Sequence, residues 1–512
     1  MNASELTVPA TSDDALTVTN PGTGHAVGTV PNLSAAAVAE VATKVRAAQP
    51  DWSALGHKGR KRWLLAFQDW IIDHAAELAD TVQSESGKPR VDAEVEVAFI
   101  VDLLGYWSRH AGDFLAEHHP RPHTPLMRVK RLTVAYSPYP VVGIITPWNF
   151  PLGMPAADVV PALAAGAGVV LKPSDVTPLT AVLLAKGWAE IGAPSVFAVA
   201  TGDAVTGAAV VDQADYVQFT GSTATGKKIA SACAATLTPY SLELGGKDPA
   251  VVLRDADIDR AVHGIAYGAL VNTGQLCVSI ERVYVEAPVY DRFVRKLVDH
   301  VNELRTGTDG RTIEHDIGPL ATEAQLDIVT RHVDQAVAAG ATVLTGGKRT
   351  GSGTFYLPTV LTDVDHTMEC MTEETFGPII PVMKVADEEE AITLANDSRY
   401  GLSASVWTTD KAHGHAVARR LFAGTVNIND SVINLFNFTI PHGGWGQSGT
   451  GSRWGGAQGV RKFCRQQALT SPALPVSNKE MAWFPYVGER VALVQKSMRA
   501  FSARGKRRFR TE

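Results

Sequence analysis

One cysteine and one glutamate in this 512-residue chain have types and spacing that suit covalent catalysis. Cys277 ends the tetrapeptide GQLC, and Glu243 lies 34 positions earlier in the segment LELGGK. A cysteine thiolate is a strong nucleophile, and a separate carboxylate can act as general base in a later step. Because a single cysteine is more often a small buried hydrophobe, the surrounding elements must decide between the two interpretations.

Short apolar runs alternate with helical segments from about Arg128 onwards and predict the sheet that would position such a site. Runs of Val and Ile between helices are typical of a parallel sheet covered on both faces, hence of a doubly wound α/β domain. Ligands in such domains bind beyond the carboxyl ends of the strands, where we expect Asn149, Lys172 and Gly221. The predicted strands are Pro140–Thr146, Gly168–Lys172, Ser195–Ala200, Tyr216–Thr220 and Pro249–Leu253.

Further elements are expected before and after this sheet in the sequence. The residues around Asn20–Gly24 predict a hairpin, and apolar residues at helical spacing predict helices over Ser34–Gln49 and Arg60–Glu85. A second α/β round begins near Gly245 and runs to about Asn434. Its expected elements are helix Asp257–Thr273, strand Arg282–Ala287, helix Tyr290–Leu304, helix Glu323–Ala339 and strand Thr342–Gly346.

Composition and charge narrow the classes of function. With 45% hydrophobic and 20% charged residues, the chain is long enough for two or three domains with proper cores. A net charge near −6 gives no broad basic surface, so no nucleic acid partner is expected. The four cysteines show neither a CxxC motif nor a Cys/His ligand spacing, which predicts no disulfide framework and no metal site.

Export and membrane spanning are not expected either. The N-terminal residues lack the basic start and apolar core of a secretory signal. The longest apolar stretch, Val159–Leu171, is shorter than the roughly twenty residues that span a bilayer and is interrupted by Pro161 and two glycines. Together with the cysteine pattern, this favours a reducing cytoplasm.

Five further motifs flank Glu243 and Cys277. They are PWNFP (Pro147–Pro151), LKPSD (Leu171–Asp175), FTGSTATGK (Phe219–Lys227), EETFGP (Glu373–Pro378) and PHGGWGQSG (Pro441–Gly449). In this order, from ESGKP at Glu85–Pro89 to about Leu469, they resemble the aldehyde dehydrogenase superfamily. The resemblance implies a dinucleotide-binding domain (1–121 and 140–244), a catalytic domain (245–434), a small β oligomerisation element with a substrate and cofactor loop (122–139 and 435–475), and a C-terminal extension (476–512).

The resemblance also implies a nicotinamide cofactor. GSTATG (Gly221–Gly226) is not the GxGxxG fingerprint, but a strand that ends at Thr220 and a helix capped by Ser222 or Thr223 would suit a pyrophosphate. Asp175 falls near the adenosine ribose and favours NAD over NADP, although its short side chain leaves room for NADP. The family's cofactor positions correspond here to Thr146, Pro147, Trp148, Lys172, Ser174, Asp175, Gly221, Ser222, Gly245, Glu374 and Phe376.

Three residues carry the chemistry that the resemblance implies. Cys277 attacks the aldehyde carbon, and the amide of Asn149 with the Cys277 backbone N–H stabilises the resulting oxyanion. After hydride transfer, Glu243 activates the water that hydrolyses the thioester. Transfer of the acyl group to coenzyme A is an alternative, but acylating members generally lack this glutamate.

Two other classes of function stay open. A cysteine–histidine protease would need a partner such as His442, which lies in a glycine-rich loop without a supporting signature. A non-catalytic binding protein on the same fold would be expected to lose the nucleophile or the base, whereas Cys277 and Glu243 are both present.

The substrate signals point in two directions. The stretch Gly274–Glu286 looks like actinobacterial enzymes named as succinate-semialdehyde dehydrogenases. Well-studied succinate-semialdehyde dehydrogenases place an arginine for the distal carboxylate eight residues after the oxyanion asparagine, where this chain has Ala157. Phe150 and Phe436 fall where other members line an aromatic tunnel, so we expect a medium-chain or aromatic aldehyde.

The resemblance implies a homodimer or homotetramer, and the C-terminal end adds a second surface. Residues Arg490–Arg510 mix apolar side chains with eight Lys or Arg. Such a segment can lie on an anionic membrane as a basic amphipathic helix. A solvated tail, or a helix docked on a neighbouring subunit, is the alternative.

Overall fold

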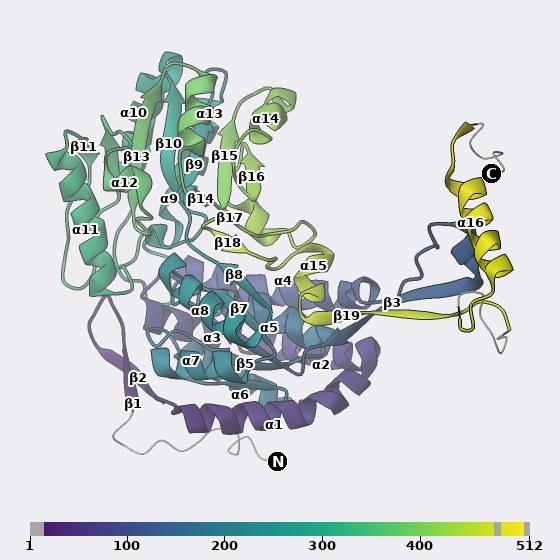
Figure 1. Cartoon of the computed structure of the whole chain (residues 1–512). Coiled ribbons are helices and arrows are strands. Elements are labelled where there is room, and N and C mark those ends of the chain that lie inside the picture. Colours follow the sequence, from purple (N-terminus) through teal and green to yellow (C-terminus); the bar gives the residue numbers. More distant parts are fainter. Residues whose placement is uncertain (1–14, 476–482, 506–512) are drawn as a thin grey trace.

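The first part of the chain forms a hairpin and four helices in the computed structural model, which describes residues 15–475 and 483–505 (Figure 1). The hairpin pairs β1 (Ala15–Thr19) with β2 (Ala26–Pro31), as expected. The helix expected over Arg60–Glu85 is wrong as one element, because His74 leaves helical angles with φ −106° and bonds the Trp70 carbonyl oxygen through its ring Nδ1 at 2.9 Å. The helices are α1 (Ala35–Ala54), α2 (Gly56–Asp73), α3 (Ala75–Ser86) and α4 (Arg90–Phe114).

A six-stranded sheet follows, in the order β18-β8-β7-β4-β5-β6. Its neighbours are parallel except for the antiparallel pair of β18 and β8, which confirms a doubly wound arrangement. The strands are β4 (Val141–Ile145), β5 (Gly168–Lys172), β6 (Phe197–Val199), β7 (Tyr216–Thr220), β8 (Tyr240–Glu243) and β18 (Gly449–Thr450). The helices between them are α5 (Gly153–Ala165), α6 (Leu179–Glu190), α7 (Ala204–Gln213) and α8 (Thr223–Thr236).

The second sheet has seven strands in the order β11-β12-β13-β10-β9-β15-β16, of which only β11 and β12 pair antiparallel. The run Pro249–Leu253 is β9 and belongs to this sheet, because it pairs with β10 and β15. The strands are β9 (Asp248–Val252), β10 (Ile280–Glu286), β11 (Thr342–Thr345), β12 (Thr359–Thr362), β13 (Ile379–Val385), β15 (Ser403–Trp407) and β16 (Thr425–Ile428). The helices are α9 (Ile258–Leu270), α10 (Ala287–Asn302), α11 (Glu323–Ala338), α12 (Glu369–Thr372), α13 (Glu388–Asn396) and α14 (Lys411–Ala418).

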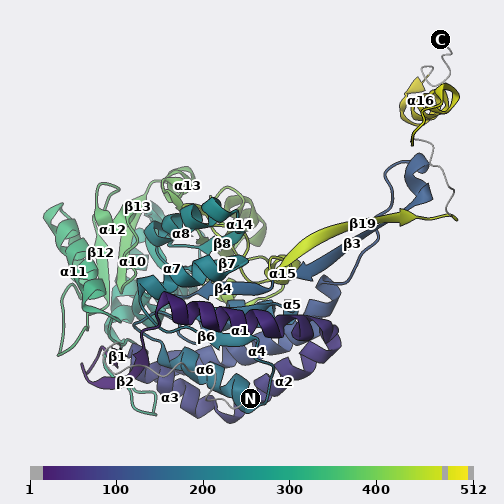
Figure 2. The ribbon, with the colours of Figure 1, turned by 60° about the horizontal axis from the view of Figure 1, so that its bottom comes forward.

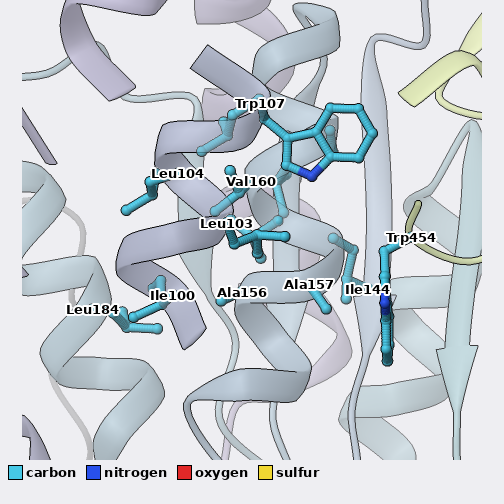
Figure 3. Packing of buried hydrophobic residues seen from close by; sticks show 14 of the residues in the cluster. Ile100, Leu103, Leu104, Trp107, Ile144, Ala156, Ala157, Val160, Leu184 and Trp454 are labelled. Atoms are coloured by element: carbon cyan, nitrogen blue, oxygen red, sulfur yellow. The ribbon is translucent and has the colours of Figure 1, made fainter. Parts of the chain in front are cut away.

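Helix α5 lies in the centre of the main core (Figure 3). All thirteen of its residues are buried, and a helix that is apolar nearly all round must be enclosed by its neighbours. Its alanines let α4 approach closely, and Leu103, Leu104 and Trp107 of α4 belong to the same buried cluster as Ala156 and Val160. Since α5 begins directly after the PWNFP motif, this packing fixes where the motif leaves the sheet.

A two-stranded antiparallel ribbon of β3 (Lys130–Pro138) and β19 (Cys464–Pro472) projects from the body, with α16 (Gly488–Ser502) near its far end (Figure 2). In the described residues, no helix is both long and apolar enough to cross a bilayer. The remaining elements are η2 (Pro125–Val129), η3 (Val271–Gly274), η4 (Ile433–Phe436), β14 (Tyr400–Gly401), β17 (Trp445–Gly446) and α15 (Gly456–Arg461).

Candidate active site

Backbone strain marks the loop that carries Cys277. Asn272 and Thr273 follow α9 in left-handed conformations, with φ 52° and 59°, which cost roughly 1–3 kcal/mol each for residues other than glycine. The Asn272 side chain donates to the carbonyl oxygens of Asn149 and Gln275 at 3.0 and 3.1 Å. These bonds tie the strained loop to the segment after β4, so Asn149 and Cys277 are held by one network.

Asn149 is fixed through both its side chain and its backbone. Its Nδ2 donates to the carbonyl oxygen of Gln275 at 2.9 Å, and its second amide hydrogen is available for a substrate oxygen. Its backbone carbonyl accepts from Lys88 Nζ at 2.8 Å, and Lys88 forms a buried ion pair of 2.5 Å with Glu96. Glu96 also accepts the amides that begin α5 at 3.0 and 2.8 Å, so this ion pair is well satisfied.

Glu243 and Cys277 have strongly shifted acidities. Glu243 ends β8 and is only 3% exposed, and burial raises its pKa to about 7 against the lowering effect of Arg453 and Lys462. Burial also raises the pKa of the Cys277 thiol to about 12, and the Glu243 carboxylate adds to this shift. Cys277 therefore rests as a thiol, whereas Glu243 can take up or release a proton near neutrality.

A cavity of about 280 Å³ brings most of the predicted site residues together at the carboxyl ends of β4, β7 and β8. This is the edge of a doubly wound sheet at which ligands bind. The lining residues are Pro147, Trp148, Asn149, Met154, Thr220, Gly221, Ser222, Glu243, Leu244, Gly245, Cys277, Gln325, Ile328, Glu374 and Phe376.

The turn from β7 to α8 suits a phosphate group. Ser222 caps α8 and accepts from the Thr225 amide at 3.3 Å, which confirms the predicted strand–turn–helix arrangement. Gly221 and Ser222 both line the cavity. Because the first amides of a helix carry partial positive charge and lack partners within the helix, this end can bind a pyrophosphate.

Glu374 is a further residue of the cavity lining. It accepts the Gly246 amide at 3.0 Å, and burial raises its pKa. A Cβ at Gly245 would lie 2.3 Å from a Glu374 carboxylate oxygen, so only glycine permits this approach. Phe376, with φ 51°, meets the Trp148 ring edge to face at 5.4 Å. The lining thus combines a helix end, a carboxylate for hydroxyl groups and aromatic walls, which fits a dinucleotide.

Four predicted cofactor residues lie outside the cavity lining, at the ends of β4 and β5. The Thr146 amide donates to the Lys172 carbonyl oxygen at 3.1 Å. Lys172 is buried, and this burial lowers its pKa, while the charge of Asp175 raises it. Ser174 donates to Asp175 Oδ1 at 3.3 Å. These residues lie along the same edge of the sheet as the cavity, beside it.

The three predicted substrate residues do not line the cavity. Phe150 is partly buried below Lys88, whose Nζ lies 4.1 Å from the ring centroid. Ala157 is fully buried in α5 as part of the core, where a methyl group is too short to reach a ligand (Figure 3). Phe436 is 40% exposed and packs edge to face on Phe99 at 6.1 Å.

Sequence reasoning missed the residues behind Glu243. His442 lies beside it, with Nε2 3.8 Å from Glu243 Oε2, because β18 pairs antiparallel with β8 and brings the glycine-rich loop over that strand. Arg453 and Lys462 face a fully buried Asp158 at 3.5 and 3.1 Å. A charged residue in the otherwise apolar α5 segment was the one available signal for this cluster.

The chain is an α/β protein with two sheets, and Cys277 lines the cavity whose walls fit a dinucleotide. A model of the aldehyde dehydrogenase family matches residues 8–469. A Mycobacterium tuberculosis protein with the provisional name succinate-semialdehyde dehydrogenase, NADP(+), 2 is 40% identical over 455 residues, which cover 88% of this chain and 87% of that protein. The 4,4'-diapolycopene aldehyde oxidase of a Methylomonas species is 36% identical over 91% of this chain and 87% of its own length.

A solved structure gives the same result. The NAD-dependent aldehyde dehydrogenase of Sinorhizobium meliloti superposes with a TM-score of 0.87 at 34% identity, and the match covers 92% of this chain and 94% of that one. The chain therefore belongs to the aldehyde dehydrogenase family. It is an oxidoreductase that oxidises aldehydes, and its cofactor is nicotinamide adenine dinucleotide in the NAD or NADP form.

Proposed function

We propose that this enzyme converts a medium-chain or aromatic aldehyde to the carboxylic acid through a thioester on Cys277. The observation that carries this proposal is the shared cavity of Cys277, Asn149 and Glu243, which also has Glu374 and Phe376 in its wall. The remaining predicted cofactor residues, at the ends of β4 and β5, are proposed to hold the adenosine part.

The proposed reaction begins at the sulfur. Cys277 loses its proton to water as its sulfur bonds to the aldehyde carbon that shares the cavity. The Asn149 amide stabilises the oxyanion that forms, a contribution worth typically about 10²–10³ in rate. A bound oxidised nicotinamide would supply the acceptor for the hydride that leaves this carbon as the C=O bond of the Cys277 thioester forms.

Hydrolysis completes the cycle. Glu243 removes a proton from water as the water oxygen bonds to the thioester carbon, the C–S bond breaks, and the acid leaves. Overall, aldehyde, water and oxidised cofactor become carboxylate, reduced cofactor and two protons. The presence of Glu243 in the cavity favours water over coenzyme A as acyl acceptor, and it also argues against a purely structural role.

The substrate preference is the first prediction. We expect a kcat/KM about tenfold or more higher for hexanal and benzaldehyde than for succinic semialdehyde, because a carboxylate entering an aromatic pocket loses hydration without an arginine partner. Among the described residues, the cavity lining includes the apolar side chains of Trp148, Met154 and Phe376 and no arginine. Steady-state rates with the three aldehydes measure this directly. A higher kcat/KM for the semialdehyde would contradict the proposed substrate class and agree with the mycobacterial relative's name.

Asp175 bears on the form of the cofactor. Its carboxylate is exposed beside the buried Lys172, where it can accept hydrogen bonds from ribose hydroxyls and repel a 2′-phosphate. We propose NAD as the preferred form, and the same assays run with NADP compare the two. The relatives' names include both NAD and NADP enzymes.

The ribbon and the cell compartment complete the proposal. Most of β19 is exposed where it projects from the body, which supports a subunit contact in a homodimer or homotetramer, measurable by analytical ultracentrifugation. All four cysteines are free thiols, as a cytoplasmic enzyme with a reactive cysteine requires.

The second prediction concerns α16. None of its side chains is buried, and it exposes Val491, Leu493, Met498 and Phe501 beside basic residues; residues 506–512 of the basic segment lie outside the described residues. If α16 lies on an anionic membrane surface, the full chain sediments with anionic vesicles more strongly than a chain that ends at Val491. Neutral vesicles serve as the control. Equal sedimentation of the two chains would favour a solvated tail or a helix docked on a neighbouring subunit.

A further inference from the structure

His442 is held rigidly behind the candidate base. It is 3% exposed, and its ring lies flat on the Trp454 indole, with 4.4 Å between centroids and 3° between planes. Its backbone amide donates to the Trp454 carbonyl oxygen at 3.2 Å, and its carbonyl accepts the Arg453 amide at 3.0 Å. The stacking fixes the plane of the imidazole, and Nε2 lies 3.8 Å from Glu243 Oε2.

Within the described residues, both ring nitrogens of His442 are buried without a hydrogen-bond partner. Such an unsatisfied buried group needs an explanation, because nearly all buried polar atoms in native proteins are paired. The Glu243 carboxyl lies within ion-pair distance of the ring, and a shift of about 1 Å would turn the 3.8 Å approach into a hydrogen bond.

Burial and the surrounding positive charges keep the imidazole neutral. Burial, with the positive charges of Arg453 and Lys462, lowers the pKa of His442 to about 3. The same two cations, together with Asp158 from α5, also face Glu243. A neutral imidazole can donate one hydrogen bond without competing for the proton that Glu243 has to accept. His442 thus has the chemistry of a fixed donor rather than of a second base.

We propose that His442 is a positioning residue for the general base, whose Nε2–H donates to the Glu243 carboxylate and holds it toward the water that hydrolyses the Cys277 thioester. This role rests on the proposed thioester mechanism. It concerns only hydrolysis, since Glu243 acts there as base, and it assigns no contact with the substrate to His442.

The test is His442→Phe, which keeps an aromatic ring on Trp454 but removes the donor. The first burst of reduced cofactor should keep its amplitude, because thioester formation does not need the donor. The steady-state kcat should fall about tenfold, and the midpoint of its rise with pH should move upward by about 1, since a carboxylate without its donor ionises less readily. His442→Asn, whose shorter side chain cannot reach Glu243, should behave in the same way. His442→Gln, with a longer donor, should recover part of the rate.

His74→Phe is the matched control. His74 also lies flat on a tryptophan, Trp70, at 4.1 Å, but it sits between α2 and α3, away from the cavity, and its replacement should leave both burst and pH profile unchanged. An unchanged pH midpoint in both His442→Phe and His442→Asn would overturn the proposal, as would a rise in aldehyde KM at constant kcat, which would assign His442 to substrate binding. A wild-type enzyme without any burst or acyl-enzyme would overturn the thioester mechanism itself, and the role of His442 with it.

Discussion

Replacement of Cys277 by alanine or serine should lower aldehyde oxidation by about 10³-fold or more, as removal of a catalytic nucleophile does in other enzymes. Neither residue can form the thioester: alanine has no nucleophilic atom, and the serine hydroxyl is far less nucleophilic than a thiolate. Formation of reduced cofactor measures the rate. Mass spectrometry of the protein mixed with aldehyde and cofactor should show an acyl group on Cys277 in the wild type and none in the variants.

A control variant separates this loss of activity from a loss of folding. Cys277 lines the cavity, whereas Cys233 is fully buried in α8 within a small apolar cluster. Cys233→Ala therefore removes one thiol without touching the site and should keep its activity, and comparable thermal unfolding of both variants would exclude a folding defect. Acid production by Cys277→Ala, or an acyl group found on another residue, would refute the mechanism.

The strands were predictable because their apolar runs are local. The runs that became β4, β5, β6 and β7 need no knowledge of distant residues, since a strand covered on both faces must be apolar along its length. The sheet to which each strand belongs was harder to predict. The run Pro249–Leu253 reads like a continuation of the first sheet, and only its pairing with β10 and β15 places it in the second.

The residues around Glu243 show the same limit at the site. His442 is distant from Glu243 in the sequence, and its position follows from the pairing of Gly449 with Glu243 between β18 and β8. Spacing alone gives no sign of this pairing, because both strands are short and the whole second sheet lies between them in the sequence. The motifs identified the reacting groups, while the side chains that set their electrostatics came from distant segments.

The substrate-binding residues were the hardest part of the site to predict from the sequence. Phe150 and Phe436 were placed by resemblance, but their contacts depend on Lys88 from the segment before α4 and on Phe99 from α4 itself. Ala157 sits in a helix whose every residue is buried, so its sequence position says more about packing than about ligand binding. The shape of the pocket depends on many such long-range contacts. The sequence motifs therefore identify the family but not the aldehyde that the pocket binds.

Replacement of Glu243 by glutamine should separate the two halves of the reaction. The variant keeps the shape of the side chain but cannot accept a proton from water, so the enzyme should release one burst of reduced cofactor per site and then stall as the thioester. The expected fall in steady-state rate is about 10²–10⁴-fold, the usual contribution of a general base. Rapid-mixing absorbance measures the burst, and mass spectrometry should find the acyl group accumulated on the protein.

The ionisation of Glu243 sets the direction in which the hydrolysis rate changes with pH. Burial raises the Glu243 pKa to about 7, so the wild-type carboxyl is protonated and inactive as a base below that pH and ionised above it. The hydrolysis rate should therefore rise with pH through about 7 and level off, whereas the glutamine variant should show no such rise. Glu40→Gln, an exposed site on α1, should keep the wild-type profile. A glutamine variant that turns over at the wild-type rate would mean that Glu243 is not the base for hydrolysis, and one that forms no burst would assign Glu243 to thioester formation instead.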